Sequence, residues 1–208
     1  MSVTEPPVRA LVFDIGRVIV RVNVNQALEG LGGASGLSTE EVWTAIQANP
    51  HWQDWQEGRM DPHQWHERLA QRFGFRLTFD EFCVTWNRVL DPETILSERL
   101  FAKLAASHRL VLLSNTDPIH AAHLEACFPF VQHFAGRVFS CRVGASKPAP
   151  AVYRKAVQES GAPAEQVLYV DDVKEYVQAG QRCGMQGLLF QGKEPLLHEL
   201  RRRGILPA

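Results

Sequence analysis

RALVFD, at residues 9–14, decides the fold, because a short apolar run stops there abruptly at an aspartate. Runs of this length that are rich in β-branched residues are typical of strands buried on both faces of a parallel sheet. We interpret further runs of the same kind as strands: residues 110–113, 167–170 and 187–190, with 137–140 as a weaker example. The chain is therefore expected to build a sheet that includes its first apolar run.

Helical patterns occupy the segments between these runs. We expect helices over residues 94–107, 118–126, 150–160 and 173–183. Gly161 and Gly184 follow the last two, where a glycine commonly closes a helix, and Pro118 and Pro150 stand where a helix can begin. Because strands and helices alternate, the sequence predicts an α/β fold in which helices cover both faces of a parallel sheet.

A long insertion follows the first strand. Residues 15–108 separate the first two strands, although a simple crossover needs only one helix. All five tryptophans lie in this segment, which indicates a separate apolar core. Two capping-box patterns mark helix starts within it: Ser38 with Glu41, and Thr78 with Glu81.

We divide the chain accordingly into two domains. A helical cap domain is expected at residues 20–91, and an α/β core domain at residues 1–19 plus 92–208, with linkers near 17–24 and 90–94. EGLGGASG, at residues 29–36, lacks the glycine spacing of a nucleotide-binding loop. We predict an irregular loop there.

Charge and composition exclude several classes of partner. The 208 residues contain 22 Lys and Arg against 23 Asp and Glu, a net charge of −1. Proteins that bind nucleic acid or anionic membranes usually cluster their basic residues, so we expect neither partner. The chain has no apolar stretch of about 20 residues and no signal-peptide pattern, and its four cysteines are far apart. We therefore expect a cytoplasmic protein without structural disulfides.

Polar side chains follow the ends of the expected strands. Asp14, Ser114 and the pair Asp171 and Asp172 come directly after strands, and Lys147 lies in the loop VGASKPAP before a helix. Ligands bind at the carboxyl edge of a parallel sheet, so these groups should converge. Neighbouring carboxylates repel unless they share a cation, and a site of hard oxygen ligands suits Mg²⁺. Taken singly, Asp172 could cap a helix, Ser114 could form a turn and Lys147 could be solvated, so only their convergence indicates a site.

Four segments resemble, in this order, the sequence motifs of the haloacid dehalogenase-like (HAD) hydrolases: FDIGRVIV, LLSNTD, SKPAP and VDDVKEYVQAGQRCGM. The resemblance extends from residue 10 to about residue 190 and includes a helical cap after the first motif. It implies a Rossmann-like parallel sheet with an inserted cap and a hydrolase that uses Mg²⁺. The D-x-G form of the first motif is most similar to the small sugar-phosphatase branch that includes α-glucose-1-phosphate phosphatase.

The resemblance also implies a nucleophile and a metal site. Asp14 would attack phosphorus and become a transient aspartyl phosphate. Mg²⁺ would be held by the Asp14 carboxylate, the Gly16 backbone carbonyl and Asp171. Asp172 would be a further ligand, bound directly or through water.

The remaining motif residues are implied to bind substrate. Ser114 would hydrogen-bond a phosphoryl oxygen, and Lys147 would neutralise charge on Asp14 and on the transferring group, so both join Asp14 as catalytic residues. Asn115 and Arg17 complete the expected substrate-binding set. Arg17 stands where the family usually has a small residue. Three roles are compatible with the sequence: its side chain contacts substrate phosphate, points into solvent, or pairs with a carboxylate of the cap.

One departure from the family pattern affects the mechanism. Most phosphatases of this superfamily carry a second aspartate two residues after the nucleophile, and this chain has Gly16 there. General acid/base assistance is typically worth about 10²- to 10⁴-fold. Its loss implies a slow enzyme, a substrate with a good leaving group, or a substitute group such as Asp172, Asp117 or a cap histidine.

These observations predict a Mg²⁺-dependent phosphatase for a small phosphorylated metabolite such as a sugar phosphate, acting as a monomer or homodimer. Two alternatives remain open: a metal-independent 2-haloacid dehalogenase, and a catalytically weak relative that binds a ligand for regulation. The pair Asp171 and Asp172 argues against the dehalogenase, because an acidic cluster without a metal would repel a carboxylate substrate.

Overall fold

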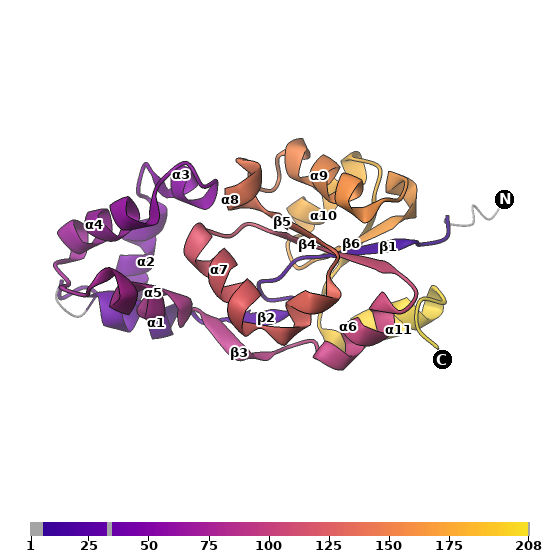
Figure 1. Ribbon diagram of the computed structural model, residues 1–208, viewed down its shortest axis with the longest axis horizontal. Helices are drawn as coiled ribbons and strands as arrows, with labels where there is room; N and C mark the ends of the chain where they lie inside the picture. The colour runs from indigo at the N-terminus through magenta and orange to yellow at the C-terminus, as the bar shows by residue number, and fades with distance from the viewer. Residues whose placement is uncertain (1–5, 33–34, 208) are drawn as a thin grey trace.

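The computed structural model describes residues 6–32 and 35–207, and it shows an α/β core beside a group of helices (Figure 1). The core contains a five-stranded sheet in the order β5-β4-β1-β6-β7, in which every neighbouring pair is parallel. Its strands are β1 (Ala10–Phe13), β4 (Arg109–Ser114), β5 (Gly136–Phe139), β6 (Val167–Asp171) and β7 (Gln186–Leu189). The first apolar run of the sequence therefore forms the central strand, and the weaker strand prediction at residues 137–140 is confirmed as β5.

Helices cover both faces of this sheet, which confirms the predicted Rossmann-like α/β fold. Leu11 and Phe13 point to one face and Ala10 and Val12 to the other, because successive side chains of a strand alternate. The first face is covered by α6 (Glu98–Ala105), α7 (Pro118–Cys127) and α11 (Lys193–Arg202), and the second by α9 (Pro150–Ser160) and α10 (Lys174–Arg182). Shorter elements are α8 (Ser140–Val143) and the 3₁₀ turns Pro129–His133 and Ala164–Gln166.

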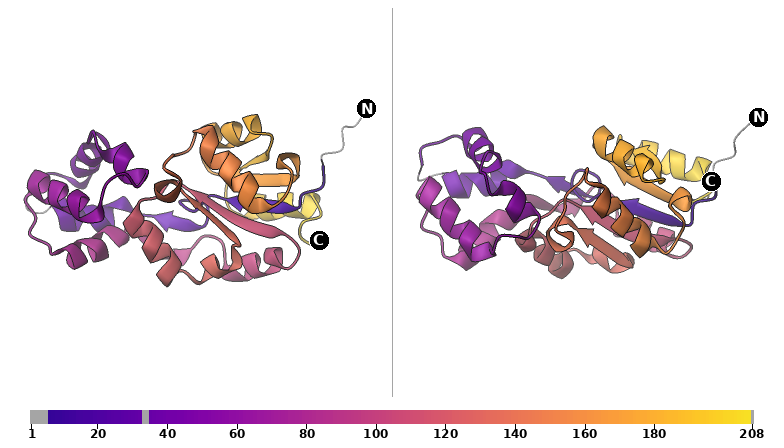
Figure 2. Two further views of the ribbon diagram at one scale, coloured as in Figure 1. Left: turned by 45° about the horizontal axis from the view of Figure 1, so that its top comes forward. Right: turned by 90° about the horizontal axis from the view of Figure 1, so that it is seen from above.

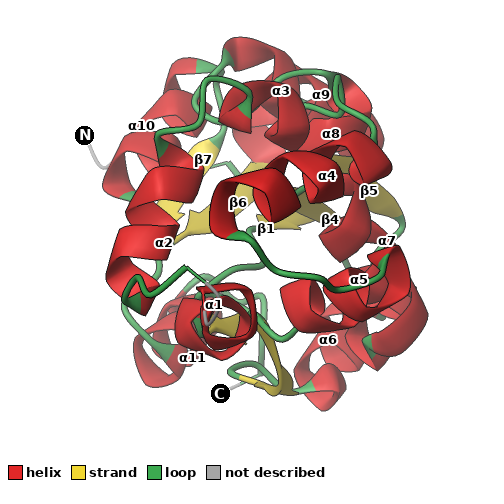
Figure 3. Ribbon diagram, turned by 90° about the vertical axis from the view of Figure 1, so that its left-hand side faces the viewer, coloured by secondary structure: helices red, strands yellow, loops and turns green. Residues whose placement is uncertain are grey.

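The inserted segment forms a helical cap over the carboxyl edge of the sheet (Figures 2 and 3). Its helices are α1 (Val24–Gly32), α2 (Thr39–Gln47), α3 (Trp52–Gln56), α4 (Pro62–Phe73) and α5 (Phe79–Asn87). Helices α2 and α5 begin with the predicted capping boxes at Ser38 and Thr78. Trp55, Trp65 and Trp86 are buried in the apolar core of the cap, where the first two rings stack with centroids 5.5 Å apart.

The two chain crossings between core and cap form a small antiparallel sheet that was not predicted from the sequence. Residues 90–94, expected as a linker, are strand β3 (Leu90–Thr94), which pairs with β2 (Val20–Val22). Because both crossings run side by side, each supplies the hydrogen-bond partners of the other. The helix expected from residue 94 consequently starts later, with α6.

The glycine-rich stretch at residues 29–36 also differs from the prediction. Helix α1 continues through Gly32, so the predicted loop is wrong for residues 29–32. Leu28 and Leu31 are buried in the cap core, and this packing outweighs the low helix propensity of the glycines. Residues 33–34 lie outside the described part of the chain.

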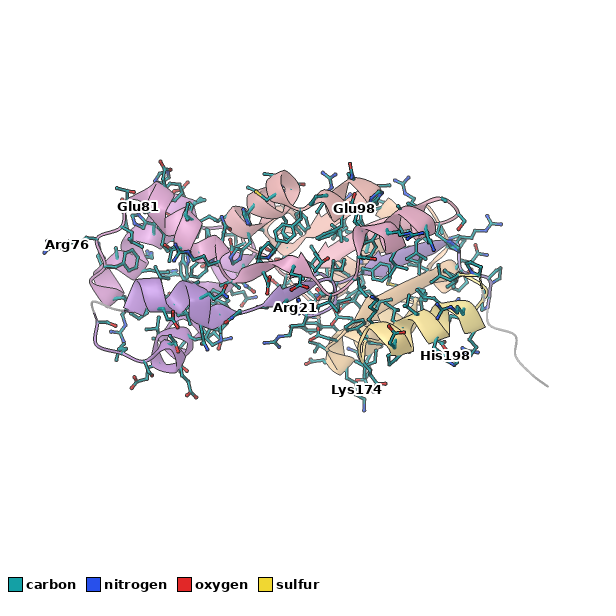
Figure 4. The ribbon with its side chains drawn as sticks, turned by 90° about the horizontal axis from the view of Figure 1, so that it is seen from below. Arg21, Arg76, Glu81, Glu98, Lys174 and His198 are labelled. Carbon is teal, nitrogen blue, oxygen red and sulfur yellow. The ribbon has the colours of Figure 1, made fainter. Side chains whose placement is uncertain are left out.

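Helix lengths and surface charge complete the description. None of the described helices is long and apolar enough to cross a bilayer. Charged side chains lie on the outside of both parts, as Arg76 and Glu81 on the cap and Lys174 on α10 show (Figure 4). The domain boundaries near residues 20 and 91 stay a prediction.

Candidate active site

Strand order brings the predicted site residues to one edge of the sheet. Strand β1 lies between β4 and β6, so Asp14, directly after β1, lies between Ser114 at the end of β4 and Asp171 at the end of β6. The Asp14 N–H donates to the Val170 carbonyl oxygen at 2.9 Å and continues the sheet ladder by one residue. Asp14 and Ser114 are each 6% exposed and Asp171 is fully buried, so all three residues are largely shielded from solvent at this edge of the sheet.

Lys147 bridges two of these carboxylates. Its Nζ donates to Asp14 Oδ1 at 2.6 Å and to Asp171 Oδ2 at 2.7 Å. Asn115 holds the lysine loop, because its Oδ1 accepts the Lys147 N–H at 2.7 Å and its Nδ2 donates to the Lys147 carbonyl oxygen at 3.1 Å. The side chain of Asn115 is thus committed to positioning Lys147.

The two consecutive aspartates have different surroundings. Asp171 Oδ1 accepts the Val173 N–H at 2.8 Å, and its Oδ2 accepts from the Tyr169 hydroxyl as well as from the lysine. Asp172 is partly buried, and no other described residue hydrogen-bonds its carboxylate. One oxygen from each of Asp14, Asp171 and Asp172 lies within 4.8 Å of the others, so the three acids form a single cluster.

Burial and mutual repulsion disturb the ionisation of this cluster. Burial, with smaller contributions from Asp171 and Asp172, raises the pKa of Asp14 to about 6 against the opposing effect of Lys147. Burial and Asp171 also raise the pKa of Asp172, with Arg17 opposing. Burial alone would lower the pKa of Lys147, but the two carboxylates that it bonds outweigh burial and raise it. One lysine therefore does not compensate three acids, and the cluster favours a further cation.

Arg17 lies in a tight loop at the edge of the site. Its φ of 60° places it in the left-handed region, which costs a non-glycine residue about 1–2 kcal/mol. The loop closes because the Arg17 N–H donates to the Val20 carbonyl oxygen at 2.7 Å, and the Val20 N–H donates to the Ile15 carbonyl oxygen at 2.9 Å. Strain of this kind is frequently stored at functional sites. The exposed Arg17 side chain makes no ion pair with a cap carboxylate among the described residues.

A pocket of about 180 Å³ lies between the cap and these loops. The core contributes Gly16, Arg17, Ser114 and Asn115 to its lining, and the cap contributes Trp43, Trp52, Gln56 and Trp86. A larger hollow of about 540 Å³ lies near β3 and α7 and contains none of the predicted site residues. We take the smaller pocket as the candidate substrate site, because Gly16, Arg17, Ser114 and Asn115 line it. Asp14, Lys147, Asp171 and Asp172 are not among its lining residues and lie beside it, at neighbouring strand ends or, for Lys147, in the loop that Asn115 holds.

Asp117, which is buried, and His120, which is partly buried, form an ion pair in the lining of this pocket that was not foreseen as a pair. Asp117 Oδ2 lies 2.8 Å from His120 Nδ1 and accepts the Trp86 Nε1–H at 3.0 Å, while Oδ1 accepts the N–H groups of Ile119 and His120. Burial would raise the pKa of Asp117 and lower that of His120, but their mutual attraction reverses both shifts. Both oxygens of Asp117 are occupied, so it is a poor candidate for the missing acid/base. The segment DPIH, at residues 117–120, could have indicated this ion pair, because a histidine three residues after an N-cap aspartate lies close to it on the first turn of the helix.

Comparisons with known proteins give a matching family, a related phosphatase and solved structures with a similar fold. The sequence model of the haloacid dehalogenase-like hydrolases matches residues 8–184. A D-ribitol-5-phosphate phosphatase from Bacteroides thetaiotaomicron is 24% identical over 192 residues, which are 86% of this chain and 90% of that protein. A HAD family enzyme from the same organism, solved with magnesium and inorganic phosphate, has a TM-score of 0.82 at 19% identity and covers 93% of this chain and 100% of its own. An L-2-haloacid dehalogenase from Xanthobacter autotrophicus has a TM-score of 0.61 at 21% identity, over 96% of this chain and 85% of its own.

Proposed function

The chain belongs to the haloacid dehalogenase-like hydrolase family, and we propose that it is a Mg²⁺-dependent phosphatase acting on a small phosphorylated metabolite. In the proposed reaction, one Asp14 oxygen attacks phosphorus while the bond from phosphorus to the leaving oxygen breaks, and water then hydrolyses the aspartyl phosphate to inorganic phosphate and free Asp14. The ribitol-phosphate phosphatase among the relatives supports this reaction class.

The placement of the Asp14 carboxylate carries the proposal. Lys147 holds Oδ1 at 2.6 Å, whereas Oδ2 has no hydrogen-bond partner among the described residues. A carboxylate held in this way presents one oxygen in a fixed direction, and the adjacent cation offsets the charge of an approaching phosphate. Ser114 lines the pocket on the neighbouring strand, and we assign its hydroxyl to donate to a phosphoryl oxygen.

The acidic cluster fits Mg²⁺. Its donors are hard oxygens within 4.8 Å of one another. Burial, with a smaller contribution from repulsion by the neighbouring acids, raises the pKa values of Asp14 and Asp172. We propose that Asp14, the Gly16 carbonyl and Asp172 hold the ion directly, because Asp171 already accepts three hydrogen bonds from the protein. Asp171 would then act from outside the ligand set, through Lys147 or a bound water. When bound, the ion neutralises phosphate charge and orients the phosphoryl group.

Proton transfer to the leaving group has no dedicated residue at Gly16. Of the substitutes that the sequence suggests, Asp117 has both oxygens occupied by hydrogen-bond donors. Asp172 has a raised pKa and a freer carboxylate, but it is also the preferred metal ligand. We therefore favour a substrate whose leaving oxygen needs little protonation, such as an anomeric or acyl phosphate.

The finer substrate proposal is a sugar phosphate. The D-ribitol-5-phosphate phosphatase supports a polyol or sugar skeleton, and the pocket of about 180 Å³ restricts the substrate to a compact molecule. The resemblance to α-glucose-1-phosphate phosphatase, the cytoplasmic location and the monomeric or homodimeric state stay predictions.

A phosphatase screen with and without Mg²⁺ tests the proposal. The wild-type protein is expected to release phosphate from at least one small phosphomonoester only with Mg²⁺, and Asp14→Asn is expected to abolish turnover. Gly16→Asp should increase turnover if proton transfer limits the rate. The aspartate should fit, because a Cβ at this position meets only Val22 Cγ2, at 3.4 Å. Phosphate release that persists without metal would contradict the assigned ligand set.

The two competing functions give different results in the same screen. The metal-independent dehalogenase would release halide from 2-chloropropionate without Mg²⁺. The regulatory relative would turn over no phosphometabolite, while one of them still raised its melting temperature.

A further inference from the structure

The cap contacts the core beside the Lys147 loop through the short segment that follows α3. Gly58 has a φ of 70°, and a Cβ there would lie 2.0 Å from the Cys141 carbonyl oxygen. No side chain fits in that space, so backbone packs directly on backbone. This segment of the cap is therefore docked on α8 of the core.

Ser140 joins this segment to the loop after β4. Its buried hydroxyl donates to the Gln56 carbonyl oxygen at 2.7 Å and accepts the Thr116 N–H at 2.8 Å. A hydroxyl can donate and accept at once, so one side chain connects a cap carbonyl with a core amide. The orientation of the docked segment is thereby fixed.

Glu57 makes the contact that leads to the catalytic loop. Its side chain is 7% exposed, and Oε1 accepts the Ser146 backbone N–H at 3.1 Å and the Gln53 amide at 3.2 Å. Oε2 accepts from Arg59 at 2.5 Å. Burial would raise the pKa of Glu57, but these three donors outweigh it and lower the pKa, so the carboxylate stays charged in the interface.

Ser146 directly precedes Lys147, so two successive N–H groups of this loop are held by side chains. The cap residue Glu57 holds the first, and the core residue Asn115 holds the second at 2.7 Å. From this anchored backbone the lysine contacts Asp14 and Asp171, at 2.6 and 2.7 Å. Of the two side-chain acceptors, only Glu57 belongs to the cap.

We propose that Glu57 is a positioning residue that couples docking of the cap to the placement of Lys147. The inference rests on the proposed phosphatase function for its kinetic consequence and on the contacts above for its structural one. When the cap separates from the core, the Ser146 N–H loses its acceptor and the lysine loop loses one of its two anchors. The nucleophile is then fully supported only when the substrate is enclosed.

Variants at Glu57 separate this role from simple packing. Glu57→Gln keeps an oxygen that can accept the Ser146 N–H, whereas Glu57→Leu fills similar space without an acceptor. Arg59→Met is the control, because it removes the other partner of the carboxylate and a longer bond from Arg59 to the Gly144 carbonyl oxygen at 3.4 Å, but does not remove the acceptor of the Ser146 N–H. Misplacement of a catalytic group by about 1 Å can cost about 100-fold in rate. We expect a fall in kcat of about 10- to 100-fold for Glu57→Leu, a smaller change in KM, and kcat within about threefold of wild type for Glu57→Gln and Arg59→Met.

Hydrogen exchange supplies a readout that does not need turnover. The Ser146 amide is expected to be protected in the wild type, Glu57→Gln and Arg59→Met, and to lose protection in Glu57→Leu, while the Val170 amide in β6 stays unchanged. Equal protection of Ser146 in all variants, or a kcat of Glu57→Gln as low as that of Glu57→Leu, would overturn the proposal. If Glu57→Leu fails to fold, Glu57→Gln is compared with the wild type instead. Loss of protection of the Ser146 amide in Glu57→Gln would also contradict the proposal, because this variant keeps an acceptor oxygen. Absence of phosphatase activity in the wild type would refute the proposed function, whereas the exchange experiment would still test the coupling of Glu57 to Ser146.

Discussion

Replacing His120 with glutamine tests the buried ion pair that joins α7 to the cap. His120 Nδ1 lies 2.8 Å from Asp117 Oδ2, and Nε2 lies 3.0 Å from the Trp86 carbonyl oxygen. The imidazole also stacks on the Trp86 ring, with ring centroids 5.6 Å apart. Because both ring nitrogens face acceptors, both must carry a proton to satisfy them, so the ring is an imidazolium. Glutamine keeps a donor of similar reach but removes the charge.

The expected loss of stability follows from the burial of the pair. Removing one partner of a buried ion pair costs about 3–5 kcal/mol. Asp117 keeps hydrogen bonds from Trp86 and from the start of α7, which places the cost for His120→Gln near the lower value, about 3 kcal/mol. In a chain of this length, 1 kcal/mol shifts the Tm by about 2–4 °C, so we expect a decrease of about 6–12 °C.

The pH dependence has a definite sign. Burial opposes protonation of His120, but Asp117 and the Trp86 carbonyl raise its pKa above the ordinary 6.5. A raised folded-state pKa gives stability that is fully present below the unfolded value and is lost as pH rises through the folded value. Asp117 sets the acid limit, because its pKa is lowered from 3.8 and its contribution disappears as pH falls through the lowered value.

Thermal unfolding at about pH 5.5 and about pH 9.5 measures this difference. The gap in Tm between wild type and His120→Gln is expected to be large at the lower pH and small at the higher one. His123→Gln is the control, since His123 lies one turn further along α7, has a lowered pKa and makes no ion pair among the described residues. An equal gap at both pH values would refute the charged state that we assign to His120.

Three further predictions concern the cap, the lysine and the metal. Gly58→Ala should undock the cap, because its Cβ would lie 2.0 Å from the Cys141 carbonyl oxygen. We expect a rise in KM or a fall in kcat of at least about tenfold, with unchanged far-UV circular dichroism. Wild-type kinetics in this variant would contradict the close approach of the two backbones. Lys147→Met should lower kcat by about 10²- to 10³-fold in steady-state assays, as expected for loss of a preorganised charge, and a loss under tenfold would contradict its assigned role. Mg²⁺ at 100 times its Kd should add about 2.7 kcal/mol to the free energy of unfolding of the wild type and so raise its Tm. The Tm of Asp172→Asn should not rise under the same conditions.

The sheet and the catalytic edge could be predicted because both depend on local patterns. An apolar run that stops at a polar residue identifies a buried parallel strand and also the end at which ligands bind. This rule predicted that Asp14, Ser114 and Asp171 converge, whereas their roles were implied by the family resemblance, and the structure places all three at neighbouring strand ends. The helix starts at Ser38 and Thr78 were equally local, since a capping box lies within four residues.

The features that were missed depend on distant partners. Strand β3 forms because residues 90–94 lie beside residues 20–22, and nothing in either segment alone predicts that pairing. Glu57 accepts the N–H of Ser146, 89 residues away, so in the sequence it reads as one more charged residue of a solvated cap loop. Gly58 was the available signal, because a glycine after a short helix indicates that a backbone approaches closely.

The distribution of charge around the pocket explains why the core, and not the cap, supplies the proposed chemistry. Among the described residues, no lining residue that the cap contributes is basic; its tryptophans and Gln56 enclose the substrate without offsetting phosphate charge. Positive charge must therefore come from the core, where Arg17 and His120 line the pocket and Lys147, beside the nucleophile, is already shared between two carboxylates. Burial, against the opposing effect of Lys147, still raises the pKa of Asp14 to about 6. A nucleophile with that pKa is partly protonated in mildly acidic solution, and no cationic side chain of residues 6–32 and 35–207 forms an ion pair with Asp172. A divalent ion held by Asp14 and Asp172 would correct both deficits at once, which is the physical reason to expect metal dependence from a cluster of three acids and one lysine.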